Sequence, residues 1–347
     1  MEQRVLARLK ELRLPEAGRI VVGFSGGSDS LALAAVLARL APVAAVQVSL
    51  FHVDHGLRPE SSEDAAQCGR LATQLGLQFT AVRLPPDLQR RHPGVGLEEA
   101  ARRERYVALA READRAGAAL VAVAHHREDQ AETVLLHLLR GAGLKGASGM
   151  AELTRLAVPW WEITSDAMVF ETNLWRPLLE EPRAIVRGYA LETGLTPVED
   201  ASNAETRFRR NRLRHEVLPL LQTIIPGADA ALARYARIAR EEDVLLNDLA
   251  ERTLRGVVRD EGTLDGRALS DEALPIQRRV VQLWLEGIAP GMEFALDRVD
   301  AILAAAHNRQ GDRRIEVGEN LTVYVTGDRL SARIERIAAG NADEEET

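Results

Sequence analysis

Six consecutive residues combine hydroxyl, carboxylate and unshielded backbone groups in a pattern suited to phosphate chemistry. They are Ser25, Gly26, Gly27, Ser28, Asp29 and Ser30. The β-branched run Ile20–Val22 before them favours a strand, and the apolar run Leu31–Leu40 after them predicts a helix. Glycines can adopt positive φ and leave their N–H groups open. A strand, a glycine turn and a helix N-terminus together form a nest of N–H donors for a phosphate or pyrophosphate.

Two carboxylates stand at the start of another predicted helix. Asp129 and Glu132 are three residues apart, so they share one face of a helix expected over 128–139. Carboxylates placed together can bind a cation or exchange protons with it. The alternative is that these acids only stabilise the N-terminus of the helix through its dipole. The same alternative is open for Asp29.

A basic run follows much later in the chain. It contains Arg210, Asn211, Arg212 and Arg214, with Glu205 and Glu216 at its ends. Much of this charge has no acid beside it in the sequence, which favours contacts to nucleic-acid phosphates. The alternative is a helix face whose arginines pair with acids of the same chain.

Several other chemistries are excluded or disfavoured by motif. The chain has neither G-x-x-x-x-G-K-[ST] nor G-x-G-x-x-G, which excludes a kinase-type P-loop and a dinucleotide fingerprint. His52, His55, His125 and His126 match no structural zinc spacing. Cys68 is the only cysteine, so the chain can form no internal disulfide, and we expect a small buried side chain in a helix.

The composition indicates an ordinary globular protein. The chain has 347 residues, 46% hydrophobic and 28% charged, with a formal net charge of −8. This length allows two or three domains, and the acidic total does not by itself indicate a nucleic-acid binder. No apolar run approaches the ~18 residues of a membrane span, and residues 1–10 do not resemble a signal peptide. We therefore expect no membrane partner and a cytoplasmic location.

The first half of the chain alternates between strands and helices. Strands are predicted over 20–24, 46–53, 78–84 and 119–124, and helices over 28–40, 61–75, 97–116 and 128–139. Continuously apolar strands alternating with helices indicate a parallel α/β sheet with helices on both faces. Ligands bind such sheets beyond the carboxyl ends of the strands. The glycine turn, the segment 52–58 and the segment 125–132 all follow strands, so we expect one shared site.

The remaining chain is predicted to be a helical region and then a small β region. We expect a catalytic domain over 1–217, helices over 218–309, a small antiparallel sheet over 310–337 and an acidic, disordered tail over 338–347. Residues 85–96 read as a loop, either a connection or a lid facing RNA. Residues 153–171 read as apolar but irregular.

The six-residue turn resembles the S-G-G-x-D-S loop of the N-type ATP pyrophosphatases, also called the PP-loop superfamily. Taken with six further motifs, the chain resembles one branch of it, the bacterial tRNA(Ile)-lysidine synthetases. The further motifs are His52–Arg58, Glu98–Arg102, Ala124–Thr133, Arg140–Gly146, Arg176–Leu179 and Glu199–Asn203 together with Arg210–Arg214. One departure is Glu128, where the family usually has aspartate. The last third of the chain resembles the family only loosely.

The resemblance implies a ligase that forms a carbon–nitrogen bond in tRNA. ATP adenylates the wobble cytidine of a minor isoleucine tRNA with the anticodon CAU and releases pyrophosphate. The side-chain amine of free L-lysine then displaces AMP and gives lysidine. The implied cofactors are ATP and Mg²⁺, the implied partners are this tRNA and lysine, and a homodimer is left open.

The resemblance also implies roles for residues. ATP would be bound by the six-residue turn with His52 and Asp54, and Asp29 would be a catalytic residue and a magnesium ligand. Asp129 and Glu132 would be catalytic, because an ammonium with a pKa near 10.4 must be held and deprotonated before it attacks. Lysine and tRNA binding is implied for His125, Glu128, Gln130, Arg210, Asn211, Arg212 and Arg214.

Three other functions remain open from the sequence. A PP-loop tRNA thiolase would need a persulfide-carrying cysteine or an iron–sulfur site, which a single cysteine disfavours. A small-molecule adenylating synthetase, such as an NAD or GMP synthetase, would not explain the arginine run. A nucleotide-binding sensor without turnover would not need Asp129 and Glu132.

Overall fold

The computed structural model divides the chain into two compact units, Met1–Arg240 and Glu241–Thr347. The structure describes residues 1–15, 17–56, 61–158, 170–198, 209–290, 292, 294–308, 312–318 and 320–334. Trp160, Trp161, the segment 199–203 and the expected tail therefore lie outside the described residues, as does Arg58. The expected domain limits stay a prediction; the division between the compact units falls within one helix.

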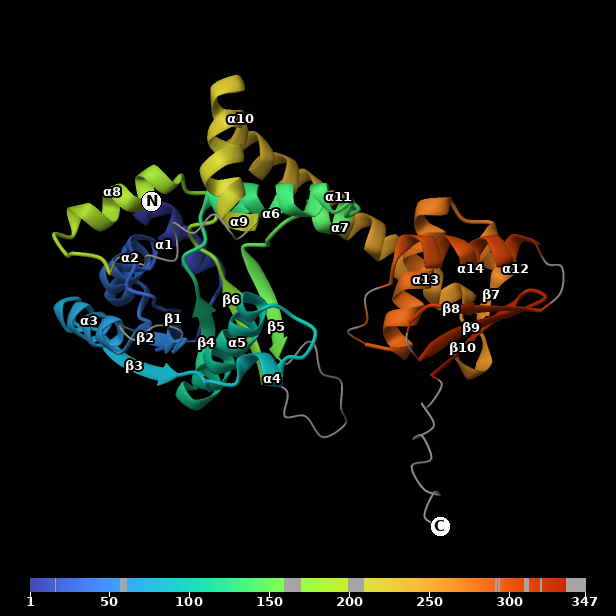
Figure 1. The fold of residues 1–347 in the computed structure, drawn as a ribbon, viewed down its shortest axis with the longest axis horizontal. Helices are drawn as coiled ribbons and strands as arrows, with labels where there is room; N and C mark the ends of the chain where they lie inside the picture. Colours follow the sequence, from blue (N-terminus) through green and yellow to red (C-terminus); the bar gives the residue numbers. More distant parts are fainter. Residues whose placement is uncertain are drawn as a thin grey trace, which may run out of the picture. The chain divides into compact units, whose positions relative to one another are not determined.

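A six-stranded sheet forms the centre of the first unit, in the order β3-β2-β1-β4-β6-β5 (Figure 1). Its strands are β1 (Arg19–Gly23), β2 (Gln47–Asp54), β3 (Gln78–Arg83), β4 (Ala118–Ala122), β5 (Leu153–Val158) and β6 (Phe170–Trp175). All neighbouring pairs are parallel except β5 with β6. The predicted α/β class is confirmed as a mostly parallel sheet. The prediction that residues 153–171 are irregular was wrong, because the segment begins with β5 and ends in β6.

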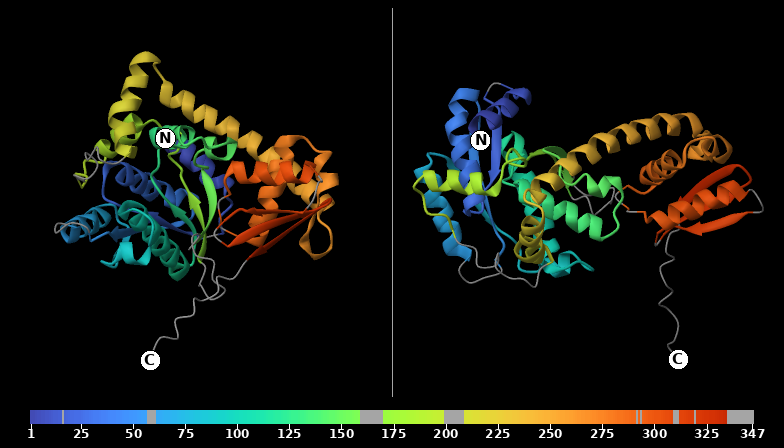
Figure 2. Two further views of the ribbon diagram at one scale, coloured as in Figure 1. Left: turned by 45° about the vertical axis from the view of Figure 1, so that its right-hand side comes forward. Right: turned by 90° about the horizontal axis from the view of Figure 1, so that it is seen from above.

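Helices cover both faces of this sheet (Figures 1 and 2). Ile20 and Val22 of β1 point to a core shared with α1 (Glu2–Glu11), α2 (Ser28–Ala44), α3 (Ser61–Gln74) and α8 (Arg183–Glu192). Val21, between them, points to the opposite core with α5 (Leu97–Ala116). Both faces of β1 are therefore apolar, which fixes it at the centre of the sheet.

The remaining helices of the first unit lie around the ends of the strands. They are α4 (Leu88–Arg91), α6 (Arg127–Leu139), α7 (Leu144–Ala147), α9 (Arg209–Arg212), the π-helix η2 (Leu213–Val217) and α10 (Leu218–Ile224). The expected loop 85–96 thus contains a short helix, held by the buried Leu88. Helix α6 begins one residue before the predicted start.

The second unit has its own core. Helix α11 (Ala228–Val257) enters it from the first unit, followed by η3 (Asp260–Gly262), α12 (Gly266–Ser270), α13 (Leu274–Ile288) and α14 (Leu296–Asn308). Its four-stranded sheet has the order β7-β10-β9-β8, with β7 (Leu264–Asp265), β8 (Arg313–Glu316), β9 (Leu321–Thr326) and β10 (Arg329–Ile334). All its pairs are antiparallel, as predicted for this region. Among the described residues, no helix has the length and apolar character that a membrane crossing requires.

Candidate active site

The glycine turn lies between the end of β1 and the start of α2. Gly26 has a φ of +81°, and a Cβ there would lie 2.6 Å from Val198 Cγ2 and 2.7 Å from Cys68 Sγ. The Gly26 carbonyl accepts a bond from the Val198 N–H at 3.0 Å. Gly27 is the N-cap of α2, and no side chain caps this end. The Gly27 N–H makes a long bond of 3.4 Å to Ser25 Oγ, and the tight packing beneath Gly26 fixes the shape of the turn.

The two serines at the edges of the turn contact each other. Ser25 Oγ and Ser30 Oγ are 3.1 Å apart, and Ser30 Oγ donates to the Gly27 carbonyl at 3.0 Å. Ser30 is buried, whereas Ser28 and Gly27 are more open. The sequence therefore placed the phosphate-type turn correctly at the carboxyl end of the central strand.

Asp29, in the first turn of α2, is directed towards the segment after β4. Its Oδ2 lies 3.7 Å from Nε2 of His126. Its Oδ1 is buried without a hydrogen-bond partner among the described residues. Burial opposes the charged form of Asp29, but the bond to His126 and the charges of His126 and Arg183 lower its pKa overall. Asp29 is thus an ionised carboxylate with one oxygen available to a ligand.

His126 is the site residue that the sequence reasoning left out. It is 1% exposed and lies among three carboxylates. Its Nδ1 is 3.2 Å from Glu128 Oε2, and its Nε2 is 3.5 Å from Asp129 Oδ2. Burial disfavours its charged form, yet Asp29, Glu128 and Asp129 raise its pKa to about 9. The His-His pair before an acidic helix start was the available signal.

Glu128 uses its longer side chain to reach α8. Its two carboxylate oxygens accept the Arg183 backbone N–H at 3.1 and 2.9 Å. Arg183 is the first residue of α8, whose initial N–H groups have no partner within the helix. Burial opposes ionisation of Glu128, but His126 and this backbone bond lower its pKa overall. Glu128 therefore joins α8 to His126.

Asp129 and Glu132 lie side by side on α6, as predicted, but they are occupied by the basic run. Arg214 donates to Glu132 Oε1 at 2.6 Å and to Asp129 Oδ1 at 2.8 Å. Arg210 Nε donates to Glu132 Oε2 at 2.8 Å. For Arg210 and Arg214 the structure therefore shows the alternative that the sequence left open, in which the arginines pair with acids of the same chain, and these acids lie about eighty residues earlier in the sequence.

The other residues of the basic run differ in their surroundings. Arg212 is exposed and pairs with Glu216 at 3.3 Å, one helical turn away. Asn211 is half-buried on α9.

Burial opposes ionisation of Asp129, but His126, His125, Arg210 and Arg214 lower its pKa to about 2. Asp129 is therefore ionised at neutral pH.

Several arginines also act on His125 through their charge. The guanidinium carbons of Arg102 and Arg105 each lie 5.7 Å from the ring centre of Tyr106. The buried Arg176 donates to the Ala151 carbonyl at 2.7 Å. Burial, together with the charges of Arg210, Arg176 and Arg105, lowers the pKa of His125 to about 3. His125 is thus a neutral imidazole between a cationic and an anionic region.

Three further residues expected at the site make structural contacts. His52 Nδ1 lies 2.9 Å from the Phe24 carbonyl, which ties the ends of β2 and β1. Asp54 accepts the Gly56 N–H at 2.7 Å. The amide of Gln130 bonds Met150 twice, donating to its carbonyl at 2.8 Å and accepting its N–H at 2.7 Å. These side chains shape the walls around the turn and α6.

The raised pKa of His126 gives a testable pH dependence. A pKa raised from 6.5 to about 9 on folding contributes stability that is complete below pH 6.5 and is lost as pH rises through 9. We expect the free energy of unfolding to fall over this range, by on the order of 3 kcal/mol at most. Urea unfolding at pH 6, 7, 8 and 9 in metal-free buffer measures it. His126→Gln should flatten this fall, and parallel curves for the two proteins would contradict the assignment.

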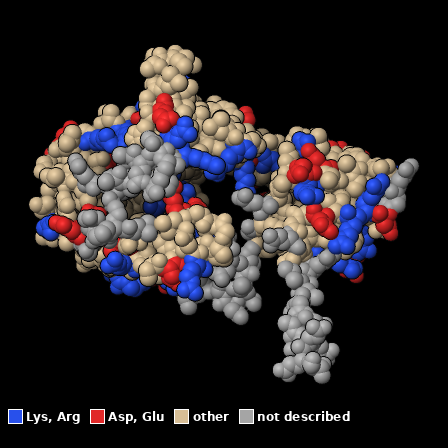
Figure 3. Space-filling view, viewed as in Figure 1, with Lys and Arg blue, Asp and Glu red and all other residues tan. Residues whose placement is uncertain are grey.

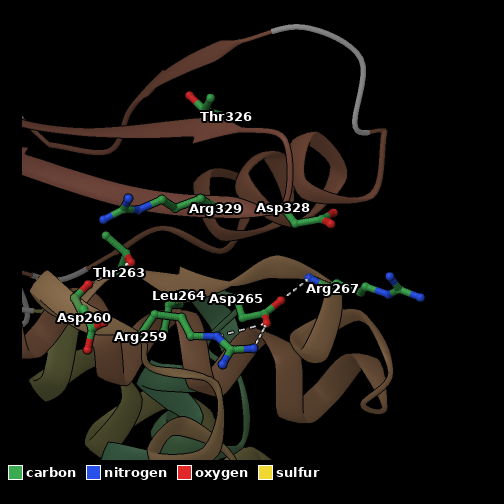
Figure 4. A pocket seen from close by; sticks show the side chains of 9 residues that line it. All are labelled: Arg259, Asp260, Thr263, Leu264, Asp265, Arg267, Thr326, Asp328 and Arg329. Carbon is green, nitrogen blue, oxygen red and sulfur yellow. Dashed lines mark hydrogen bonds and ion pairs between the residues drawn. The ribbon is translucent and has the colours of Figure 1, made fainter.

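The second unit contains a separate pocket of about 420 Å³ (Figure 4). It is lined by Arg259, Asp260, Thr263, Leu264, Asp265, Arg267, Thr326, Asp328 and Arg329. None of the expected site residues lies there. Arg259 pairs with Asp265, and Arg329 pairs with Glu261 at 2.9 Å. Figure 3 likewise shows basic and acidic side chains intermingled on the visible face of this unit.

Comparison with known proteins identifies the family of the chain. Residues 1–221 match the family model described as the PP-loop domain. A tRNA(Ile)-lysidine synthase of Symbiobacterium thermophilum is 38% identical over 325 residues, which are 90% of this chain and 64% of that protein. This chain therefore spans less than two thirds of that relative. A tRNA(Ile)-lysidine synthase of Salinispora arenicola is also 38% identical, with 92% of this chain and 91% of that protein covered.

A solved structure shares the fold. The U34-tRNA thiolase NcsA of Methanococcus maripaludis superposes with a TM-score of 0.54 at 17% identity, covering 69% of this chain and 78% of that one. An identity this low supports the fold alone. The family model covers well over half of the chain, and the Salinispora relative is similar over nearly its whole length. The chain therefore belongs to the PP-loop family and, within it, to the tRNA(Ile)-lysidine synthases.

Proposed function

We propose that the protein ligates L-lysine to the wobble cytidine of an isoleucine tRNA with the anticodon CAU, using ATP. The observation that carries this proposal is the single cluster that joins the glycine turn to the acid pair. Asp29 of the turn and Asp129 of α6 both lie within 4 Å of one buried imidazole, that of His126. This arrangement supports a single site in which the turn would bind phosphate and the acid pair would bind a cation.

The glycine turn would stabilise the pyrophosphate that leaves during adenylation. Open N–H groups at a helix N-terminus favour negative charge there. Arg183 adds positive charge near Asp29, and its Nε is buried without a hydrogen-bond partner among the described residues. These groups would neutralise the charge that develops on the phosphates.

The donor set also fits a magnesium ion. Asp29 Oδ1 is a buried, ionised oxygen without a hydrogen-bond partner among the described residues. Among those residues, no three acidic, histidine or cysteine side chains are grouped to hold a metal by themselves. Mg²⁺ is commonly held by one or two carboxylates together with substrate phosphates, and Asp29 would be such a carboxylate. When bound, the ion would supply positive charge to the phosphates of ATP.

The acid pair would orient the lysine amine for the second step. Asp129 and Glu132 place carboxylate oxygens at the start of α6, where they suit an ammonium group, and the pKa of Asp129 is lowered to about 2. The positive charges of Arg105 and Arg176, which act on His125, would suit a carboxylate. A zwitterionic amino acid would match this separation of charge. Free tRNA as substrate would place the reaction in the cytoplasm.

A thiolase reading is disfavoured by the position of Cys68. The thiol is fully buried in α3 beneath the glycine turn, and burial, with Asp64 nearby, raises its pKa to about 12. A nucleophilic cysteine needs the thiolate, which this environment suppresses. Cys68→Ser should therefore leave lysine incorporation nearly unchanged, although the buried hydroxyl is expected to lower stability. Loss of turnover in a folded variant, checked by circular dichroism, would support thiol chemistry instead.

One experiment separates the proposed ligase from a small-molecule synthetase and from a sensor. The protein is incubated with ATP, labelled lysine and total tRNA, and both label in RNA and released pyrophosphate are measured. Label in RNA with tRNA-dependent pyrophosphate release is expected. Pyrophosphate release without tRNA would indicate a small-molecule substrate, and no release under any condition would indicate a sensor.

A further inference from the structure

We propose that Arg210 and Arg214 determine when lysine is admitted, because they occupy the same carboxylate oxygens that the lysine amine needs. Backbone phosphates of the RNA substrate would draw the two arginines away and so open the acid pair. This inference rests on the proposed function. Figure 1 shows α9, which carries Arg210, beside α6, which carries the acid pair.

The geometry leaves little of the acid pair available. Glu132 is 0% exposed, and each of its oxygens accepts a guanidinium N–H. Arg214 contributes bonds of 2.6 and 3.0 Å, and Arg210 contributes one of 2.8 Å. Asp129 is 7% exposed and accepts a further bond from Arg214 at 2.8 Å. Two carboxylates and two guanidinium groups thus form one hydrogen-bonded set.

Lysine alone is a poor competitor for this set. Its side chain brings one ammonium with three donors, whereas the arginines provide two cations in a forked geometry that suits carboxylates. An ammonium that displaced one guanidinium would also leave that guanidinium partly buried without a counter-charge. A replacement anion for the arginines would remove this obstacle.

The arginines are placed where such an anion could reach them. Their side chains are 28% and 17% exposed for Arg210 and Arg214 respectively, so each has an open edge. Arg214 lies on the π-helix η2, a rare helix type that is frequent at functional sites. Arg–phosphate contacts use the same two-pronged geometry as Arg–carboxylate contacts. A phosphate can therefore replace the carboxylate as the partner of the guanidinium, with the same two-pronged hydrogen bonding.

The alternative is that the arginines are permanent supports that keep Asp129 and Glu132 oriented for lysine. The two roles predict opposite changes in lysine affinity when an arginine is removed. A support, when removed, weakens lysine binding. A competitor, when removed, strengthens it.

The experiment measures lysine binding by calorimetry to the full chain, with ATP but without RNA. We expect Arg214→Gln to tighten lysine binding about tenfold or more, equivalent to ~1.4 kcal/mol. The matched control is Arg209→Gln, which removes the same charge from an exposed position of α9 and should change nothing. Weaker binding in Arg214→Gln than in wild type, or equal tightening in the control, would overturn the proposal.

Two further arms keep the result interpretable. Arg214→Lys retains the charge but not the fork, so it should give intermediate affinity, and thermal melting shows whether both variants are folded. An RNA stem-loop with the CAU anticodon should tighten lysine binding to wild type but add little in Arg214→Gln. If wild type incorporates lysine but Arg214→Gln does not bind it more tightly, the competitor role is contradicted and the proposed function is not. If wild type neither binds nor incorporates lysine, the proposed function itself is contradicted.

Discussion

Asp129→Asn and Glu132→Gln should each reduce lysine incorporation by about 100-fold or more, while ATP binding persists. General acid–base groups commonly contribute effects of this size. The amides keep the shape of the side chains but cannot hold an ammonium by charge or accept its proton. ATP binding should survive because the glycine turn lies on β1 and α2, whereas both carboxylates lie on α6. Equilibrium ATP binding and incorporation of labelled lysine are measured side by side.

The control for this pair must separate chemistry from folding. Glu132 is fully buried against Arg210 and Arg214, so removal of its charge leaves guanidinium groups without full compensation. Urea unfolding of each variant therefore accompanies the assays, at a temperature where both are folded. Incorporation at the wild-type level in either folded variant removes that residue from the mechanism.

Gly26→Ala should have the second large effect, a loss of ATP affinity of tenfold or more together with lower stability. Gly26 has a φ of +81°, which an alanine adopts only with strain, and its Cβ would lie 2.6 Å from Val198 Cγ2. The new methyl group must push the turn outward or displace Val198. Either movement disturbs the N–H nest that would hold the phosphates. Calorimetric titration with ATP measures the affinity, and thermal melting measures the stability.

Gly27→Ala supplies the comparison for stability. Its φ is −64°, and an added Cβ would meet Ser25 Oγ only at 3.5 Å, an ordinary contact. We expect its melting temperature to stay close to wild type. Equal destabilisation by the two substitutions would show that the packing beneath Gly26 is not what shapes the turn.

Local patterns in the sequence were sufficient to predict most of the first unit. The alternation of strand and helix patterns predicted β1 to β4 to within two residues, and the apolar β-branched run of β1 reflects a strand that is buried on both faces. Helix α5 coincides with its predicted range, 97–116. The rule that ligands gather at the carboxyl ends of parallel strands correctly predicts that the glycine turn and α6 lie close together.

The segment over 153–171 shows where local patterns failed. Residues of β5 alternate between exposed and half-buried, with Val158 buried at the end, and β5 pairs antiparallel at the edge of the sheet. An edge strand needs no continuous apolar run, so it lacks the signal that identified β1. Its position depends on β6, which the sequence pattern does not specify.

The partners of the acid pair could not be predicted for a different reason. A sequence pattern predicts ion pairs only between residues that are close in the chain, and few acidic residues lie near Arg214. Its actual partners, Asp129 and Glu132, come from a helix made far earlier. Glu128 is similar, since its reach to the backbone of Arg183 spans 55 residues. Long-range pairing of this kind is a property of the fold.

The separation between Glu132 and its partners has a consequence for synthesis of the chain. Arg210 and Arg214 follow Glu132 by 78 and 82 residues. At a typical translation rate of 5–20 residues per second, about 4 to 16 seconds pass before both arginines exist. A buried carboxylate without a counter-charge is strongly disfavoured, so the acidic face of α6 stays hydrated during this interval. The interior of the nascent first unit is therefore completed from its C-terminal side, after the strands of its sheet have already left the ribosome.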